Sequence, residues 1–182
     1  DFLKGGKMKI IEFDGKTPNI NKSVKIFDNV MIIGDVEIGE DSSVWFGSII
    51  RGDVNKIVIG DRTNIQDLVI IHTYQPDDGM FPNGLGVNVG NDVTIGHRVT
   101  LHACKIGNRC LIGMGSVILD NAEVGDDCFI TASSLLPKNK KYPPRSLISG
   151  NPAKVVRQLR EEEILNIKKE AAFYVNLKNQ YK

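Results

Sequence analysis

Aliphatic residues recur at every sixth position from residue 20 to residue 136. The residues of this repeat are Ile20, Ile26, Ile32, Ile38, Val44 and Ile50; Ile59, Ile65 and Ile71; Val89, Ile95 and Leu101; and Ile106, Ile112, Ile118, Val124, Ile130 and Leu136. Glycine commonly follows the aliphatic residue, as in Ile38-Gly39 and Val124-Gly125. This pattern is the main structural signal in the chain.

A period of six matches neither the 3.6-residue period of a helix nor the simple alternation of a strand. It predicts a short strand and a tight turn, stacked in coils so that each aliphatic side chain points to a shared axis. Residues two positions before the aliphatic are usually small or β-branched, as at Ser48, Val69 and Ala122. The pattern resembles the hexapeptide-repeat proteins, in which three hexads make one coil. That resemblance implies an all-β fold, a left-handed parallel β-helix shaped as a triangular prism.

Interruptions in the repeat divide the chain into three parts. Residues 1–19 form an N-terminal segment, in which Met8 is a candidate native start and residues 1–7 a candidate remnant of cloning. Residues 20–136 form the β-helix, with a Pro-, Gly-, Asp- and Asn-rich loop at 75–87 predicted to protrude from it. Residues 137–182 contain a crossing segment and a C-terminal helix that packs on the prism. Its predicted inward face holds Ile164, Ile167, Ala171, Tyr174 and Val175.

The composition narrows the classes of partner. Lys and Arg together number 23 and Asp and Glu 22, so no strong net field favours nucleic acid or an anionic membrane. We find no apolar run long enough to span a bilayer and no signal-peptide pattern near the start. Cys104, Cys110 and Cys128 lack CxxC spacing, which favours core thiols in a reducing compartment. We therefore expect a cytoplasmic protein that binds neither nucleic acid nor membrane.

The three histidines occupy two kinds of position in the repeat. His72 follows Ile71 and His102 follows Leu101, so both take the slot just after an inward aliphatic residue. His72 and His102 are 30 residues apart. If the protruding loop accounts for about 12 of these residues, about 18 remain, which is one coil. The two histidines should then stack on neighbouring coils, ~4.8 Å apart. His97 lies nearly one prism face earlier than His102, too far for a comfortable shared metal in the same chain. A three-histidine site therefore requires His97 from another subunit of a trimer.

Several longer motifs resemble the gamma-class carbonic anhydrases, in particular their short, bacterial-type branch. These motifs are RGDVNKIVIGDRTNIQD, VIIHT, TIGHRVTLHACKIGN, LIGMGSVILDNAEV and SGNPAKVVRQL. The resemblance implies that His72, His97 and His102 bind a divalent metal across the interfaces of a homotrimer. Zn²⁺ is the expected metal, with Fe²⁺ or Co²⁺ as alternatives. It also implies reversible hydration of CO2 to bicarbonate by a metal-bound hydroxide.

The same resemblance implies roles for residues around the metal, which are Gln66, Asn64, Arg51, Asp53, Asp67 and Tyr174. The amides of Gln66 and Asn64 would orient hydroxide and bicarbonate. Arg51, Asp53 and Asp67 match interface ion pairs near the site, although a purely structural salt bridge explains Arg51 and Asp67 equally well. The Tyr174 hydroxyl would reach the metal pocket, or the ring would simply pack in the core.

One departure from the most active members of that family leaves other functions open. Those members carry glutamates that shuttle protons after the Arg-x-Asp motif and beyond the first histidine. Here the two stretches read Val54-Asn55 and Thr73-Tyr74-Gln75, and Asp77 and Asp78 in the loop are the nearest substitutes. The activity could therefore be weak. One alternative is a non-catalytic trimeric metal-binding or assembly protein, since some relatives are labelled as ferric-siderophore-binding proteins. The other is a hexapeptide acyltransferase.

Overall fold

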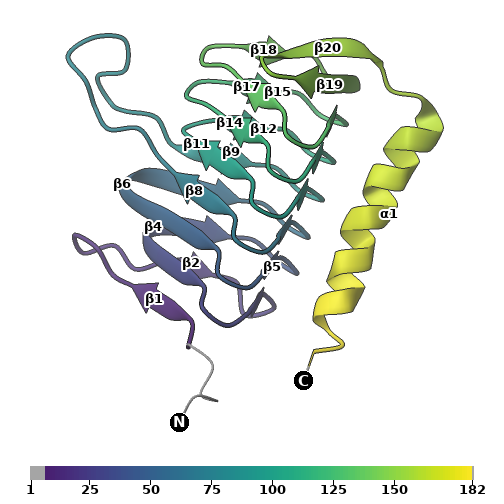
Figure 1. Ribbon diagram of the computed structural model, residues 1–182. Helices are drawn as coiled ribbons and strands as arrows, with labels where there is room; N and C mark the ends of the chain where they lie inside the picture. The colour runs from purple at the N-terminus through teal and green to yellow at the C-terminus, as the bar shows by residue number, and fades with distance from the viewer. Residues whose placement is uncertain (1–6, 182) are drawn as a thin grey trace.

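The computed structural model describes residues 7–181 and shows a parallel β-helix flanked by one helix (Figure 1). The predicted left-handed hexapeptide-repeat fold is confirmed. Its strands stack in parallel register along three faces, in two hydrogen-bonded sheets. The first two faces share one sheet, because two long strands turn the corner between them. No helix within residues 7–181 is both long and apolar enough to cross a membrane.

Each face is a ladder of short strands. The first face contains β1 (Lys9–Ile11), the first part of β4 (Met31–Ile38) and of β6 (Ile49–Ile59), β8 (Ile70–His72), β11 (Thr100–His102), β14 (Val117–Ile118) and β17 (Leu135–Leu136). The second contains β2 (Asn19–Ile20), the remainder of β4 and β6, β9 (Val87–Val89), β12 (Lys105–Ile106), β15 (Glu123–Val124) and β18 (Lys141–Tyr142). The third contains β3 (Lys25–Ile26), β5 (Ser43–Val44), β7 (Asn64–Ile65), β10 (Thr94–Ile95), β13 (Leu111–Ile112), β16 (Phe129–Ile130), β19 (Ser146–Gly150) and the antiparallel β20 (Ala153–Gln158).

The hexad residues fill the interior as the repeat predicts. Residues such as Ile65, Ile95 and Ile130 are fully buried in one continuous core, and the three free cysteines are buried in it as well. The predicted end of the β-helix at residue 136 is wrong, because β18 and β19 continue the second and third faces. Tyr142 and Ile148 take the next two inward positions. An aromatic residue in an inward slot concealed this continuation from a search for aliphatic residues.

The corner in β4 and β6 depends on two glycines. Gly34 has a φ of 73°, and a Cβ there would lie 2.5 Å from the carbonyl oxygen of Gly52. A Cβ on Gly52 would in turn lie 2.5 Å from the carbonyl oxygen of Asp35. Only glycine fits so close a crossing of two backbones. Gly52 of the RGD sequence therefore allows the turn that sets Arg51 on the first face and Asp53 beyond it.

The outward side chains immediately before the inward aliphatic residues differ from face to face. On the first face they are mostly apolar: Met31, Ile49, Ile70, Thr100, Val117 and Leu135. On the second they are mostly polar or charged: Asn19, Glu37, Val58, Asn88, Lys105, Glu123 and Lys141. On the third they become apolar towards the C-terminal coils: Lys25, Ser43, Asn64, Thr94, Leu111, Phe129 and Leu147. Of the three faces, the third is the one on which the helix of residues 7–181 packs.

Helix α1 (Glu161–Lys178) covers that third face and runs back towards the first coils (Figure 1). Its predicted inward residues Ile164, Ile167 and Ala171 are buried, whereas Tyr174 is half-buried. Ile164 and Ile167 of its first half, together with Leu159 just before the helix, pack on the apolar outward side chains of the third face. At the other end the buried Lys178 ammonium contacts Asp41 at 3.2 Å. The helix is thereby fixed to the prism at both ends.

Candidate metal centre

His72 and His102 lie side by side on neighbouring strands of the first face. They are register partners in β8 and β11, so the predicted stacking of these two residues is confirmed. His72 Nδ1 lies 3.3 Å from His102 Nε2. Two imidazole nitrogens bound to one tetrahedral zinc would be separated by about the same distance, ~3.3 Å. The spacing within this pair therefore fits two ligands of one ion.

The outer nitrogens of both rings contact carboxylates. His72 Nε2 lies 3.1 Å from Asp53 Oδ1, and His102 Nδ1 contacts Asp120 Oδ1. A neutral imidazole has a single N–H, and these contacts assign it to the nitrogen facing the carboxylate. Both facing nitrogens then present lone pairs to each other, an arrangement that requires a cation or a proton between them. Carboxylates behind the rings are also the usual partners of metal-binding histidines.

Arg51 and Asp53 build the surroundings of His72. Arg51 is the register partner of His72 on the preceding coil, and its Nη1 donates to Asp53 Oδ2 at 2.6 Å. Burial raises the pKa of Asp53, but hydrogen bonds from Arg51 and His72 outweigh burial and lower it overall. Burial also lowers the pKa of His72, although Asp53 opposes that shift. The net effect favours a neutral imidazole, the form that can bind a metal.

Asp120 provides the corresponding support for His102. It lies one coil beyond His102, its side chain is 7% exposed, and it also pairs with Lys138. Burial raises its pKa, but hydrogen bonds from Lys138 and His102 lower it overall, so the carboxylate is ionised at neutral pH. Asp120 was not among the residues predicted from the sequence. Its 18-residue spacing from His102, one coil in this fold, is the signal that could have identified it.

His97 lies elsewhere, at the corner that follows β10 on the third face. Its Nδ1 lies 2.6 Å from Asp67 Oδ2, at the same corner of the preceding coil. Asp67 therefore contacts His97 within the chain, rather than Arg51. His97 has a side chain 42% exposed, and its Nε2 is the nitrogen not engaged by Asp67. It thus has the same carboxylate support as the other two histidines but on a different surface.

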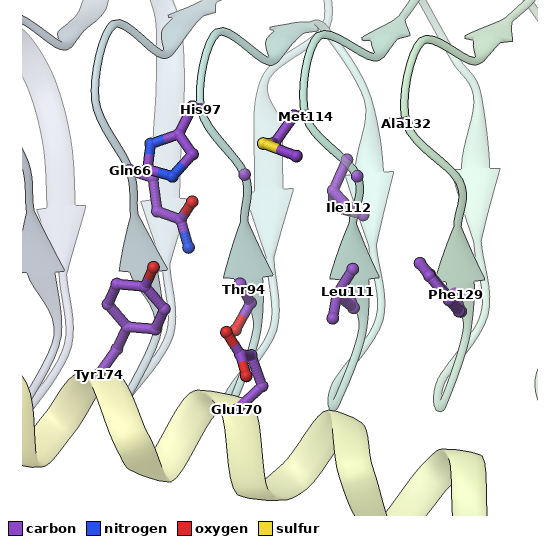
Figure 2. Close-up of a pocket in the computed structure, with 12 residues that line it drawn as sticks. Gln66, Thr94, His97, Leu111, Ile112, Met114, Phe129, Ala132, Glu170 and Tyr174 are labelled. Atoms are coloured by element: carbon purple, nitrogen blue, oxygen red, sulfur yellow. The ribbon is translucent and has the colours of Figure 1, made fainter.

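A groove of about 300 Å³ opens beside His97, between α1 and the third face. Gln66, Tyr174 and Glu170 also line it, together with apolar residues such as Leu111 and Met114. In Figure 2, Tyr174 and Glu170 rise from the helix towards the strands that carry Gln66 and Thr94. The predicted site residues Gln66, Tyr174 and His97 therefore lie together, apart from the His72–His102 pair. That pair lines a separate cavity of about 200 Å³.

Hydrogen bonds and burial hold the side chains of this groove in place. Gln66 Nε2 donates to Asn64 Oδ1 at 3.2 Å, and Asn64 Nδ2 donates to Thr94 Oγ1 at 2.9 Å. Burial raises the pKa of Tyr174, so its hydroxyl stays protonated and can donate a hydrogen bond. The Tyr174 ring packs edge-on against the buried Trp45, with 5.6 Å between ring centroids. The amides and the hydroxyl are thus oriented before any ligand enters.

The site residues consequently form two half-sites in one chain. Within residues 7–181, no cluster of three or more His, Cys, Asp or Glu side chains is arranged to hold a metal. One half-site contains His72 and His102 with Arg51 and Asp53. The other contains His97 and Asp67 with the amides and hydroxyl of the groove. A site with three histidine ligands would need one half from each of two subunits.

Comparison with known proteins defines the class first. Residues 103–138 match the bacterial transferase hexapeptide family, a model of six repeats. The fold matches the crystal structure of a hexapeptide transferase family protein from Anaplasma phagocytophilum, with a TM-score of 0.87 and 39% identity. That match covers 95% of this chain and 98% of the other. The chain is thus a hexapeptide-repeat β-helix protein.

Two relatives identify the family within that class. The chain is 46% identical to a carbonic anhydrase from Geobacillus kaustophilus, over 95% of this chain and 91% of the relative. It is 38% identical to the mitochondrial gamma carbonic anhydrase 2 of Arabidopsis thaliana, over 89% of this chain but only 58% of that relative. The chain belongs to the gamma-class carbonic anhydrase family. By family it is a carbonic anhydrase-like lyase.

Proposed function

We propose that this chain hydrates CO2 reversibly to bicarbonate in a homotrimer, with a divalent metal shared between subunits. His72 and His102 of one subunit and His97 of its neighbour would hold the metal. The observation that carries this proposal is the pair of imidazole nitrogens that face each other 3.3 Å apart, with a carboxylate behind each ring that favours a lone pair on the facing nitrogen. Such a pair is destabilising unless a cation or proton occupies the space between the rings.

The surfaces of the prism support a shared site. The outward column of the first face is mostly apolar and lies beside the His72–His102 pair, whereas α1, the helix of residues 7–181, packs on the third face. Next to it, Leu68 and Met114 are 56% and 52% exposed at the corner that carries His97. Contiguous exposed apolar surface of this kind is typical of protein interfaces. A closed ring of three chains would bury it by setting one subunit's corner against the next subunit's first face.

The donor set suits Zn²⁺, Fe²⁺ or Co²⁺, because neutral imidazole binds all three. When bound, such a metal would lower the pKa of water towards neutrality and make it a nucleophile for CO2. The Gln66 amide, held by Asn64, would orient the reacting oxygen atoms by hydrogen bonding. The protonated Tyr174 hydroxyl would donate to bicarbonate, and the apolar wall of Leu111 and Met114 would accept the uncharged CO2.

A non-catalytic metal-binding trimer is the second candidate. The cavity beside His72 and His102 is lined by Val54, Thr73, Tyr74 and Gln75, which supply no carboxylate to accept a proton. That feature favours slow turnover or none. An acyltransferase is the third candidate, and binding of acetyl-CoA without any metal would support it.

Elemental analysis combined with stopped-flow CO2 hydration tests the proposal, using protein loaded with Zn²⁺, Co²⁺ or, without oxygen, Fe²⁺. We expect one metal per chain and a rate above buffer, both lost in His97→Ala. Arg98→Ala, which changes an adjacent residue of the same corner, is the matched control and should keep both. A metal-replete trimer with no rate above buffer would refute the hydratase and leave the metal-binding role.

A further inference from the structure

Net hydration of CO2 releases a proton that must leave the site: CO2 + H2O → HCO3⁻ + H⁺. A histidine or a carboxylate that exchanges protons with solvent can perform such a step. The sequence offered Asp77 in the protruding loop for this role. Its Oδ1 instead accepts the backbone N–H groups of Gly79 and Phe81, at 3.0 and 2.8 Å, and so closes a turn within the loop. Asp77 is also absent from the lining of the His72–His102 cavity.

Glu170 is the single carboxylate among the residues that line the groove beside His97. It lies on α1, one helical turn before Tyr174, so both side chains share the face that looks onto the groove (Figure 2). Glu170 is solvent-exposed, and the carboxylate that His97 contacts is Asp67. Burial is the main cause of the raised pKa of Tyr174, and Glu170 lies close enough for its negative charge to raise that pKa further.

We propose that Glu170 is the proton relay of this site, carrying the released proton from the groove to buffer in solution. The proposal rests on the proposed CO2 hydration. The proton passes along water molecules from the reacting water to the Glu170 carboxylate, which becomes a neutral carboxylic acid. A buffer base then removes the proton and restores the carboxylate. In the reverse reaction the same group delivers the proton that converts bicarbonate to CO2 and water.

Glu170→Gln tests the relay, because it preserves shape and removes the titrating group. In dilute buffer kcat should fall about tenfold or more. The value of kcat/KM for CO2 should not change, since it reports the steps before proton release. Imidazole at high concentration should restore kcat by accepting the proton directly. Glu162→Gln, a carboxylate in the first turn of the same helix and outside the groove, is the matched control and should behave as the parent.

A second measurement does not depend on activity. Titration of tyrosinate absorbance, assigned by difference from Tyr174→Phe, should show a lower midpoint for Tyr174 in Glu170→Gln than in the parent. An unchanged midpoint would contradict the placement of Glu170. Two outcomes with an active parent would refute the relay alone. One is a Glu170→Gln variant with unchanged kinetics, and the other is a variant that loses kcat and kcat/KM equally and is not restored by imidazole. A metal-replete parent without any rate would refute the proposed hydration itself, and the relay with it.

Discussion

Subunit mixing gives the sharpest test of the split site. His97→Ala keeps the His72–His102 pair, whereas His102→Ala keeps His97. In the proposed ring of three, each site would take its single histidine from one subunit and its pair from the next. After random reassembly of a 1:1 mixture, each contribution is intact with a probability of one half, so about one quarter of wild-type sites should re-form. Each variant alone should retain no tightly bound metal.

The assay is metal content per chain, measured on reassembled trimers after dialysis against a weak chelator. A mixture of His72→Ala with His102→Ala is the matched control, because both changes damage the same half-site and no intact pair can form. It should remain at the level of the separate variants. Recovery of no metal in the first mixture, or stoichiometric metal in His97→Ala alone, would refute the assignment of the half-sites to different chains.

Three further outcomes are expected. Asp120→Asn, which removes the carboxylate behind His102, should weaken metal binding about 10- to 100-fold in a chelator competition, and unchanged affinity would contradict its supporting role. Ile70→Lys, on the apolar first face, should dissociate the proposed trimer in sedimentation experiments. Asn88→Lys, on the charged second face, is the control and should not. An Ile70→Lys variant that remains trimeric would argue against the first face as the interface. Hydrogen bonds from Arg109 lower the pKa of Asp127 below its usual 3.8. The pair therefore contributes its full stabilisation when the pH is above 3.8, and this contribution is lost as the pH falls through the lowered pKa. Asp127→Asn should therefore reduce the loss of stability in acid, measured by urea unfolding at stepped pH, and an unchanged acid dependence would contradict it.

Regular spacing explains how much of the fold the sequence could predict. In a hexapeptide repeat the chain closes on itself in coils of nearly constant length, so position in the repeat decides whether a side chain points inwards or outwards. Ile71 and Leu101 therefore predicted the stacking of His72 on His102 once the loop between them was set aside. The rule failed where an inward position held an unexpected residue, as at Tyr142.

Partners across the coils were harder to predict. Asp120 and Asp67 contact their histidines at whole-coil spacings, so a search for such spacings would have found them. Lys178 gave no comparable signal. Its ammonium is buried against Asp41 because the helix happens to end beside the first coils, and neither the length of the crossing segment nor its path follows from the repeat.

The sequence by itself determined the β-helix, the stacked histidine pair and the separation of His97 from that pair, because all three follow from repeat position. The tertiary structure alone decided which surfaces surround these residues. It placed α1 over the third face, which brought Tyr174 and Glu170 to the groove beside His97. Within residues 7–181 it also left the apolar first face without a helix over it. Packing of distant segments, which no local pattern encodes, thus built the groove beside His97.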